Sequence, residues 1–420
     1  MAETVKVLIW GTAEQGPCAY FRGHMYDEEL KKHGIEMRHI DKVNFIADPS
    51  AQGMSQAEAS AKGLLKIDTS DIDWADVVVF RRYYNSSAQC MDKGCNFRTK
   101  SPVEAMAHPH EVQGRDGITD MMWPAFNTRA HNKAIIYETD DNHFKIRDWN
   151  GYYYDVKLEW DVIEQMARRA DLVTVSTGPI KDEYSRFNDN IRVIRNAIDP
   201  SIYTSDIERP IHGGDLPRVV YYGSTVRMRD YAGEWDPEHN RHKGGYAGKA
   251  VEELRSKKKL WNIFIGVNPG TEHIIAPYFD EAHYYVENIK QFSKTLANAN
   301  ADIGIAPLVG DEFDRCKSEL HWLEYAITGA AFVGEGFRRG EAPYSMIRHG
   351  VDGFLARTAQ EWYSSMKSLV ESKDLRQQIA GAAKERVLLE YDYKVRAKEW
   401  ADAYRWAAEH PNYGLRERGD

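Results

Sequence analysis

The sequence predicts an α/β protein built from two doubly wound domains, each with a parallel sheet. Short apolar runs alternate with stretches of helical periodicity, which is typical of βαβ units. The alternation stops in a polar stretch near the middle of the sequence and then begins again. The length of 420 residues also exceeds one ordinary hydrophobic core and favours two or three domains.

In the first half, the predicted strands are short and mainly apolar, and the clearest of them are VVVF at 77–80 and AIIY at 134–137. Such runs are expected where helices cover both faces of a parallel sheet. A helix is predicted over 20–32, because Gly34 stands just past its end. The predicted strands are 5–10, 35–40, 76–80, 134–137, 172–176 and 192–194.

The second half starts after a polar joint at 206–217, which contains two prolines and a Gly-Gly pair. We predict domains over 1–206 and 207–393, and a final helical segment, 394–420, that packs across the joint. Two long irregular segments, 84–131 and 227–259, interrupt the pattern, and such segments are usually functional or disordered. The second-half strands are predicted at 219–224, 261–266, 303–307 and 331–333, and the last helices at 361–369, 375–390 and 394–409.

Composition excludes some classes of protein. The net charge of -9 argues against a large nucleic-acid surface. No stretch approaches the roughly 18 apolar residues of a membrane helix, and the first residues lack the form of a signal peptide. The four cysteines include no second pair to complete a zinc site with Cys90 and Cys95, so we expect thiols and a cytoplasmic setting.

Ligands of open α/β sheets bind outside the carboxyl ends of the strands. In the first half, Gly11 and Gly16 in GTAEQGP would let backbone approach an anion, and Arg22 could reach the same place. The alternatives are a plain tight turn and a solvated arginine. Asp140 and Asp141 in ETDDN could orient or deprotonate a hydroxyl or hold a metal, or one of them could cap the next helix.

In the second half, the turn GSTVRMRD suits a diphosphate, because glycine allows close approach and arginine offers forked donors. The alternative is a basic turn on the surface. The candidate residues there are Gly223, Ser224, Arg227 and Arg229.

The stretch KSELHWLEYAITG, 317–329, predicts a helix whose buried face includes Leu320. Lys317 and Ser318 precede this helix and would favour an anion at its start. Glu324 lies on the edge of the buried face and could accept two hydrogen bonds from a ribose diol. The alternative is a glutamate bonded to neighbouring backbone or to an arginine. No G-x-G-x-x-G follows any strand, so a nicotinamide dehydrogenase is not predicted.

Several motifs together resemble the retaining, family-4-like glycosyltransferases of the GT-B fold (glycosyl transferases group 1). The first-half motifs PCAYFR and YETDDN resemble a branch found in phage and bacterial surface-glycan clusters. The other motifs are IRVIRNAIDPSIY at 191–203, IGIAPLVGDEFDRCKSELHWLEYAITG at 303–329, SMIRHGVDGFLA at 345–356 and EWYSSMKSLVESKDLRQQIAGAAKERV at 361–387.

The resemblance implies two Rossmann-like domains facing a cleft, with a UDP- or GDP-sugar in the second domain and an acceptor in the first. It implies transfer of a hexosyl or pentosyl group with retention, without a metal or another cofactor. Glu324 matches the glutamate that binds the donor ribose. Arg227, Lys317 and Ser318 would meet the diphosphate, and Asp140 or Asp141 would act on the acceptor hydroxyl.

The sequence departs from the family at two places. Cys316 stands where the first of a pair of glutamates is expected, and Lys243 is only a distant counterpart of the family's diphosphate lysine. The acceptor is left open among a glycan, a protein, a small molecule and a hydroxylated DNA base. The basic run at 241–259 could contact DNA phosphates or form a solvated helix face. Two other classes are a sugar-nucleotide epimerase and a catalytically silent nucleotide-sugar-binding protein.

Overall fold

The computed structural model describes most of the chain, and residue contacts divide it into two units. Unit 1 comprises Met1–Glu14, Arg22–Ile194 and Ala397–Asp420, and unit 2 comprises Gln15–Phe21 and Arg195–Arg396. Gly16 and nearly all of the predicted irregular segment 84–131 lie outside the described residues. These are 4–11, 17–40, 45–55, 58–59, 62–81, 89–90, 112–113, 128, 131–148, 153–158, 160–207, 214–236, 241–243, 245–337, 340–341 and 343–411.

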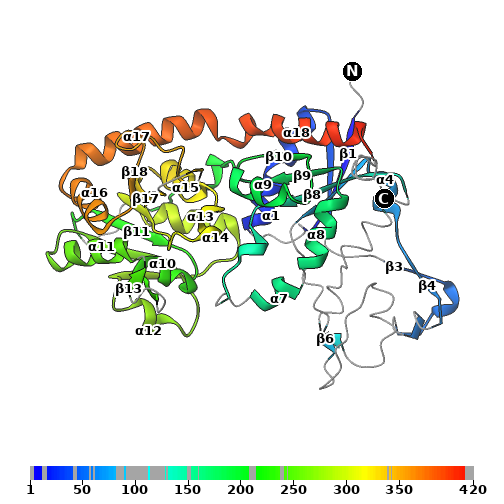
Figure 1. Ribbon diagram of the computed structural model, residues 1–420, viewed down its shortest axis with the longest axis horizontal. Coiled ribbons are helices and arrows are strands. Elements are labelled where there is room, and N and C mark those ends of the chain that lie inside the picture. Colours follow the sequence, from blue (N-terminus) through cyan, green and yellow to red (C-terminus); the bar gives the residue numbers. More distant parts are fainter. Residues whose placement is uncertain are drawn as a thin grey trace. The chain divides into compact units, whose positions relative to one another are not determined.

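Unit 1 contains a six-stranded parallel sheet in the order β2-β1-β5-β8-β9-β10 (Figure 1). All six predicted strands are confirmed, with ends that differ by at most two residues. The order reverses direction between β1 and β5, which is the usual place for a ligand in an open sheet. The strands are β1 (Val5–Trp10), β2 (Ile35–Ile40), β5 (Val77–Arg81), β8 (Ala134–Thr139), β9 (Leu172–Val175) and β10 (Ile191–Val193).

The helix predicted over 20–32 is interrupted. Gly23 takes a non-helical conformation, with φ -147° and ψ -92°, and splits the segment. The pieces are α1 (Pro17–Arg22), the 3₁₀ helix η1 (His24–Tyr26) and α2 (Asp27–Lys32). Three acidic residues in the first turn of α2 and two lysines in its last turn complement the helix dipole.

Further short elements complete the description of the first half. They are β3 (Phe45–Ala47), η2 (Pro49–Ala51), β4 (Leu65–Ile67), α4 (Ser70–Trp74), β6 (Gln89–Cys90), β7 (Val112–Gln113), η4 (His143–Lys145), α7 (Tyr153–Leu158), α8 (Trp160–Arg169), α9 (Gly178–Tyr184) and η5 (Pro200–Ile202).

Unit 2 contains a second six-stranded parallel sheet, in the order β15-β14-β11-β16-β17-β18. This order reverses between β11 and β16, as in a dinucleotide-type Rossmann domain. The sequence prediction missed the two edge strands, β15 and β18. The strands are β11 (Arg218–Tyr222), β14 (Trp261–Val267), β15 (Glu281–Tyr284), β16 (Ile303–Ala306), β17 (Ala331–Glu335) and β18 (Phe354–Ala356).

Helices pack on both faces of the second sheet. On one face, Val219 and Tyr221 of β11 join the core formed with α11 and α16. On the other face, Tyr222 contacts Phe292 of α13 and Tyr325 of α15. Because successive strand residues point to opposite faces, β11 is buried throughout and is apolar or aromatic after its first residue, Arg218.

The helices of unit 2 confirm the last three predicted ones, but they also occur at 228–232 and 246–256, within the segment 227–259 that was predicted to be irregular. They are η6 (Thr225–Arg227), α10 (Met228–Ala232), α11 (Tyr246–Ser256), α12 (Glu272–Ile275), α13 (Ile289–Asn298), α14 (Glu312–Arg315), α15 (Leu320–Thr328), α16 (Ala359–Glu371) and α17 (Lys373–Glu390), with the small strands β12 (Glu234–Asp236) and β13 (Arg241–Lys243). Helix α18 (Tyr393–Glu409) contributes its residues from Ala397 onward to unit 1.

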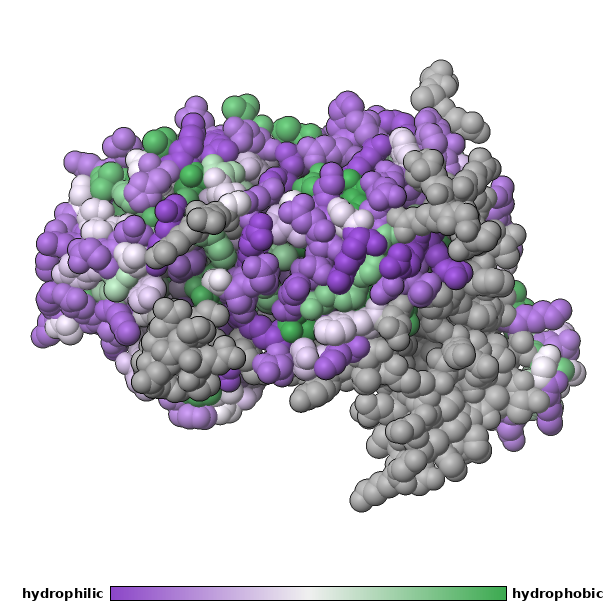
Figure 2. All heavy atoms as spheres, viewed as in Figure 1, coloured by the Kyte–Doolittle hydropathy of each residue, from purple (hydrophilic) through white to green (hydrophobic). Residues whose placement is uncertain are grey.

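The surface drawn in Figure 2 is mostly hydrophilic, with hydrophobic residues scattered over it. Scattered apolar residues are normal on a protein surface. Within the described ranges, no helix combines the length and the apolar character needed to cross a bilayer.

Candidate active site

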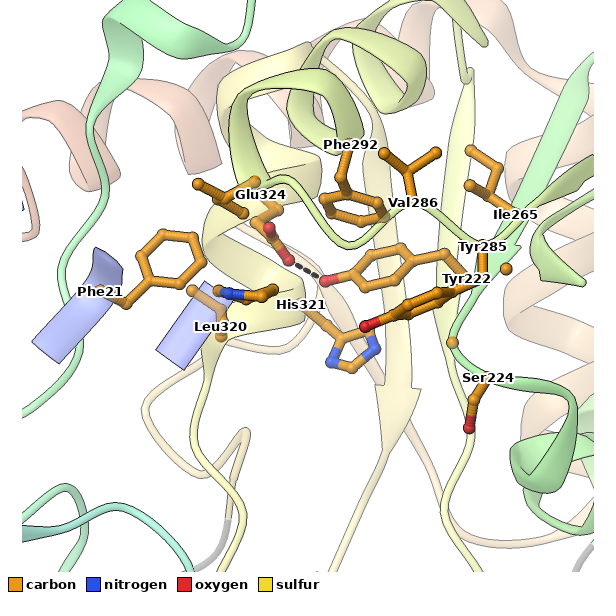
Figure 3. A pocket seen from close by; sticks show the side chains of 14 residues that line it. Phe21, Tyr222, Ser224, Ile265, Tyr285, Val286, Phe292, Leu320, His321 and Glu324 are labelled. Carbon is orange, nitrogen blue, oxygen red and sulfur yellow. Dashed lines mark hydrogen bonds between the residues drawn. The ribbon is translucent and has the colours of Figure 1, made fainter. Parts of the chain in front are cut away.

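A pocket opens at the carboxyl ends of β11 and β14 in unit 2, beside the point where the strand order reverses (Figure 3). Its walls come from the ends of β11 and β14, from the loops after β11 and β15, and from helices α1, α13 and α15. The lining residues are Pro17, Phe21, Tyr222, Gly223, Ser224, Ile265, Gly266, Tyr285, Val286, Ile289, Phe292, Leu320, His321 and Glu324.

Two glycines shape the wall where β11 and β14 end. Gly266 has a φ of +122°, and a Cβ there would lie 2.0 Å from the carbonyl oxygen of Gly223. Gly223 itself has a φ of +151°, and a Cβ there would lie 2.9 Å from Cδ of Arg227. The close approach of the two backbones therefore requires glycine at 266, whereas at 223 the positive φ favours glycine and the nearest neighbour is the side chain of Arg227.

Glu324 lies on the pocket wall, in the second turn of α15, and is only 1% exposed. Its carboxylate accepts a hydrogen bond of 2.7 Å from the hydroxyl of Tyr203 and a second from the hydroxyl of Tyr222. Burial raises the pKa of Glu324 to about 7, although both tyrosine hydrogen bonds act to lower it. The partners are therefore tyrosines, and not the backbone or arginine that the sequence left open.

His321 lies one turn before Glu324 and also lines the pocket. Its ring stacks on the ring of Tyr222, with 4.3 Å between centroids and 13° between planes. Burial lowers the pKa of His321 to about 3, and the positive charges of Arg227 and Lys317 lower it further. The lowered pKa favours the neutral form of His321 at pH 7, and both cations lie close enough to His321 to act on its charge.

Arg227, Lys317 and Ser318, which were predicted to bind the diphosphate of the donor, each contact a different kind of group. The guanidinium of Arg227 pairs with Asp230 at 3.4 Å, and the amino group of Lys317 lies 4.1 Å from the ring centroid of Phe313. The hydroxyl of Ser318 accepts a hydrogen bond of 2.8 Å from the side-chain amide of Asn196.

Three further residues of the second half were singled out in the sequence, namely Arg229, Cys316 and Lys243. Arg229 is exposed, one turn from the pocket loop. Cys316 is buried, with 4% of its surface exposed, and brings no charge to a ligand. The side chain of Lys243 lies outside the described residues. Of the predicted donor set, Gly223, Ser224 and Glu324 therefore line one pocket, with Arg227 and Lys317 beside it.

Arg22 of unit 1 is a buried arginine, and not a solvated one. Its Nε donates to Glu138 at 2.8 Å, its Nη1 donates to the carbonyl of Ile194 at 2.5 Å, and its guanidinium lies 4.7 Å from the ring centroid of Trp400. Glu138 also accepts a hydrogen bond of 3.2 Å from Arg81. This placement gives Arg22 a structural role, whatever part it plays toward a ligand.

Asp140 and Asp141 follow β8 and are half-buried. Hydroxyl groups fix their backbone, because Ser176 donates to the carbonyl of Asp140 and Thr139 to that of Asp141. Neither aspartate caps the next helix, since the N-cap of η4 is Asn142. Burial would lower the pKa of Arg22, but the carboxylates of Glu138 and Asp140 raise it overall, so Asp140 lies near Arg22.

Gly11 ends β1 with a φ of +94°, and its N–H donates to the carbonyl of Ile40 at 2.8 Å. This residue is therefore part of the carboxyl edge of the unit 1 sheet, as predicted for a loop that follows a strand. Gly11, Arg22 and Asp140 all belong to this edge or to the helix that follows it.

Sequence reasoning missed His321 and the two tyrosines that bond to Glu324. His321 could have been found, because a residue three positions before Glu324 shares its helix face. Tyr285 and Val286 were missed because they follow β15, an edge strand whose alternating polar sequence, EAHY, gave no apolar signal.

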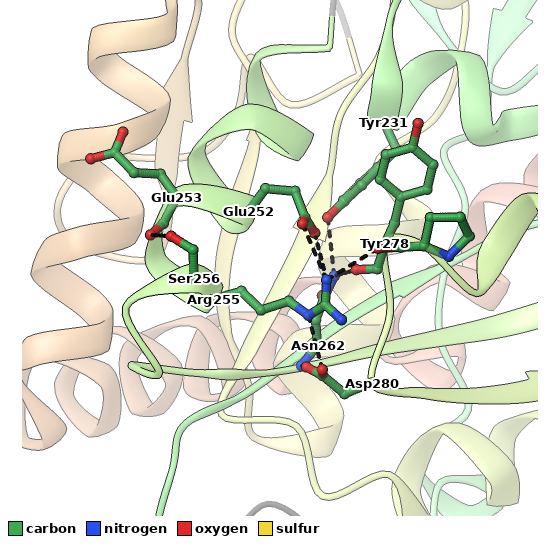
Figure 4. Close-up of polar contacts among 9 residues, drawn as sticks. Tyr231, Glu252, Glu253, Arg255, Ser256, Asn262, Tyr278 and Asp280 are labelled. Atoms are coloured by element: carbon green, nitrogen blue, oxygen red, sulfur yellow. Dashed lines mark hydrogen bonds and ion pairs between the residues drawn. The ribbon is translucent and has the colours of Figure 1, made fainter.

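Three residues of the basic run at 241–259 form ion pairs within the chain, and Figure 4 shows those of Arg255. Arg255 pairs with Asp280 at 2.9 Å and with Glu252 at 3.1 Å. Lys257 pairs with Glu253 at 2.6 Å, and Lys259 pairs with Glu371 at 2.5 Å. Three cations of the run are therefore paired with carboxylates of the chain, whereas Lys249 and Lys258 are exposed.

Comparison with known proteins identifies the architecture. No protein-family model matches the sequence. No curated protein matches it in sequence either. Solved structures do match, at low sequence identity.

HepE from Anabaena, in complex with UDP, matches 96% of this chain and 100% of its own, with 13% identity and a TM-score of 0.54. Sucrose-phosphate synthase from Thermosynechococcus elongatus matches 96% and 98%, with 11% identity and a TM-score of 0.58. A glycosyltransferase from Rickettsia africae matches 96% and 98%, with 11% identity and a TM-score of 0.51. This chain has the fold of these proteins, two Rossmann-like domains of GT-B type. The fold class predicted from the sequence is confirmed.

Proposed function

We propose that this protein is a glycosyltransferase that moves a sugar from a nucleoside diphosphate sugar to an acceptor hydroxyl. The pocket of unit 2 carries the proposal. It lies where the sheet order reverses, it is lined by apolar and aromatic side chains, and its wall presents a carboxylate with no ion-pair partner among the described residues. HepE, which has the same fold, binds UDP and UDP-glucose.

The ribose and the diphosphate of the donor each have proposed partners. Glu324 would accept hydrogen bonds from the ribose, and Ser224, Arg227 and Lys317 would meet the diphosphate, with Ser318 and Arg229 as further predicted contacts. The two cations near His321 would balance the charge that develops on the departing diphosphate, so we propose no metal in that role. We also propose that the sugar is transferred with retention of configuration. A cytoplasmic location is proposed as well, and it fits the free thiols of Cys18 and Cys316.

The donor is tested by calorimetry with UDP, UDP-glucose, GDP and 2′-deoxy-UDP on the full chain. We expect Glu324→Gln to weaken UDP binding by about 1–3 kcal/mol, the usual effect of losing a charged hydrogen-bond partner. If the carboxylate binds the 2′-hydroxyl, the wild type prefers UDP over 2′-deoxy-UDP and the variant does not.

A matched control is Glu281→Gln. Glu281 is a partly buried carboxylate of unit 2 at the amino end of β15, where it bonds to Arg218 and Trp261. Its replacement is expected to leave UDP affinity unchanged. Equal UDP affinity in the wild type and in Glu324→Gln would contradict the ribose assignment.

The acceptor side is tested by Asp140→Asn and Asp141→Asn. We propose that one of these carboxylates orients or deprotonates the acceptor hydroxyl, so its loss should lower kcat by about 10²–10⁴-fold with little effect on donor KM. Full activity in both variants would rule out this role. Epimerised donor without transfer would instead favour an epimerase, and donor binding without turnover would favour a binding protein.

A further inference from the structure

Unit 1 holds a cluster of metal-ligating side chains that the proposed transfer reaction does not use. His24 in η1, Asp27 at the start of α2 and His39 in β2 converge from three elements. Nδ1 of His24 lies 3.6 Å from Oδ2 of Asp27, and Nε2 of His39 lies 2.9 Å from Oδ1. The two imidazole rings lie 4.0 Å apart between centroids, with 33° between their planes.

We propose that His24, Asp27 and His39 form a binding site for a divalent transition metal of the zinc type. In a tetrahedral zinc site, bond lengths of about 2.0–2.1 Å place neighbouring ligand atoms about 3.3 Å apart. The two nitrogen–oxygen separations, 3.6 Å and 2.9 Å, end on different oxygens of Asp27, and one ligand atom from each residue lies within 4.8 Å of the others. Small side-chain movements would therefore complete the site.

The ligand types select the class of metal. Two imidazoles and one carboxylate suit Zn²⁺, Co²⁺ or Ni²⁺, whereas Mg²⁺ and Ca²⁺ prefer sites made of oxygen atoms alone. The side chains of His24 and Asp27 are about one-third exposed, and that of His39 is 11% exposed. Water can therefore supply the fourth ligand of a tetrahedral ion.

The position of the cluster indicates what the metal would do. His39 lies next to Ile40, whose carbonyl accepts the N–H of Gly11 at the end of β1. β2 is an edge strand of the unit 1 sheet. An ion held by these three residues would join η1 and α2 to the carboxyl end of this strand and stabilise unit 1. The inference does not rest on nucleotide binding.

The test is a calorimetric titration of the untagged full chain with Zn²⁺ after removal of metals by a chelator. We expect one site per chain that His24→Ala, His39→Ala or Asp27→Asn each weakens by at least tenfold, since even residues outside the ligand set usually change metal affinity by about 10–100-fold. Co²⁺ should show the strong visible absorption of tetrahedral coordination. Mg²⁺ should not compete.

A matched control is His131→Ala. His131 pairs with Asp73 at 2.5 Å, so it shares the histidine–carboxylate contact but lacks the second imidazole found in the cluster. Its replacement should leave the Zn²⁺ stoichiometry and affinity unchanged. The melting temperature of each metal-free variant shows whether the fold is retained, and Asp27→Asn preserves side-chain volume if the histidine variants unfold. No Zn²⁺ binding, or unchanged binding in folded variants of the cluster, would overturn the proposal.

Discussion

Two buried glutamates, one in each unit, are held in opposite ways. Glu138 of unit 1 is 1% exposed and lies between two arginines, Arg22 at 2.8 Å and Arg81 at 3.2 Å. Glu324 of unit 2 is equally buried, but the partners described for its carboxylate are two neutral hydroxyls. The first carboxylate has its charge balanced inside the protein, and the second does not.

The difference separates a structural carboxylate from one available to a ligand. An ionised group buried without a counter-charge costs free energy. Burial accordingly raises the pKa of Glu324 to about 7. Such a cost is tolerated where function requires it, and Glu324 lies on a pocket wall beside neutral His321.

The largest expected effect is on the arginine-bound carboxylate. Glu138→Ala leaves two buried guanidinium groups without their partner, and we expect it to lower the free energy of unfolding by about 3–5 kcal/mol. Denaturant unfolding measures the loss, and Glu36→Ala, an exposed glutamate of β2, serves as the control with little change. If Glu138→Ala is as stable as the wild type, the view of Glu138 as a structural carboxylate, in contrast to Glu324, is wrong.

The second effect is a pH dependence specific to Glu324. Its pKa is about 7 in the folded protein and near 4.5 when unfolded, so the folded state binds the proton more tightly. Stability is therefore highest below about pH 4.5 and falls as the pH rises to about 7. Relative to Glu324→Gln, the wild type should lose roughly 2–3 kcal/mol across this range. Parallel stability curves for the two proteins would contradict the raised pKa.

The smallest effect concerns the tyrosine partners. Tyr203→Phe removes one hydrogen bond to Glu324, and we expect a loss of about 1–2 kcal/mol near neutral pH. Because that bond lowers the pKa of Glu324, its removal should also shift the pH dependence upward. Tyr325→Phe is the control, since Tyr325 donates to the backbone carbonyl of Val220 at 2.8 Å and should change stability without moving the pH dependence.

The sequence predicted the central strands well, and for a physical reason. Strands covered on both faces are apolar throughout, as in VVVF of β5, so they are visible in a local pattern. β15 was missed because its exposed positions alternate with covered ones and it carries two ionisable side chains in four residues.

The candidate site was only partly predictable. Helical spacing placed Glu324 beside Leu320, and both line the pocket. Its partner Tyr203 is 121 positions away in the sequence, and Glu138 is 116 positions from Arg22. Pairings over such separations depend on the assembled sheet, so no local pattern contains them. Val395 illustrates the same limit, because it is an apolar residue of the final helix and yet is 55% exposed.

The composition of unit 1 has a consequence for the timing of its assembly during translation. Arg22 and Tyr26 pack against Trp400, although the preceding segment of the unit stops at Ile194. Ribosomes add about 5–20 residues per second, so roughly 10–40 s pass between synthesis of Ile194 and of Ala397. During that interval the residues that later pack against α18 have no partner from this helix. We therefore expect the newly synthesised first half to bind chaperones.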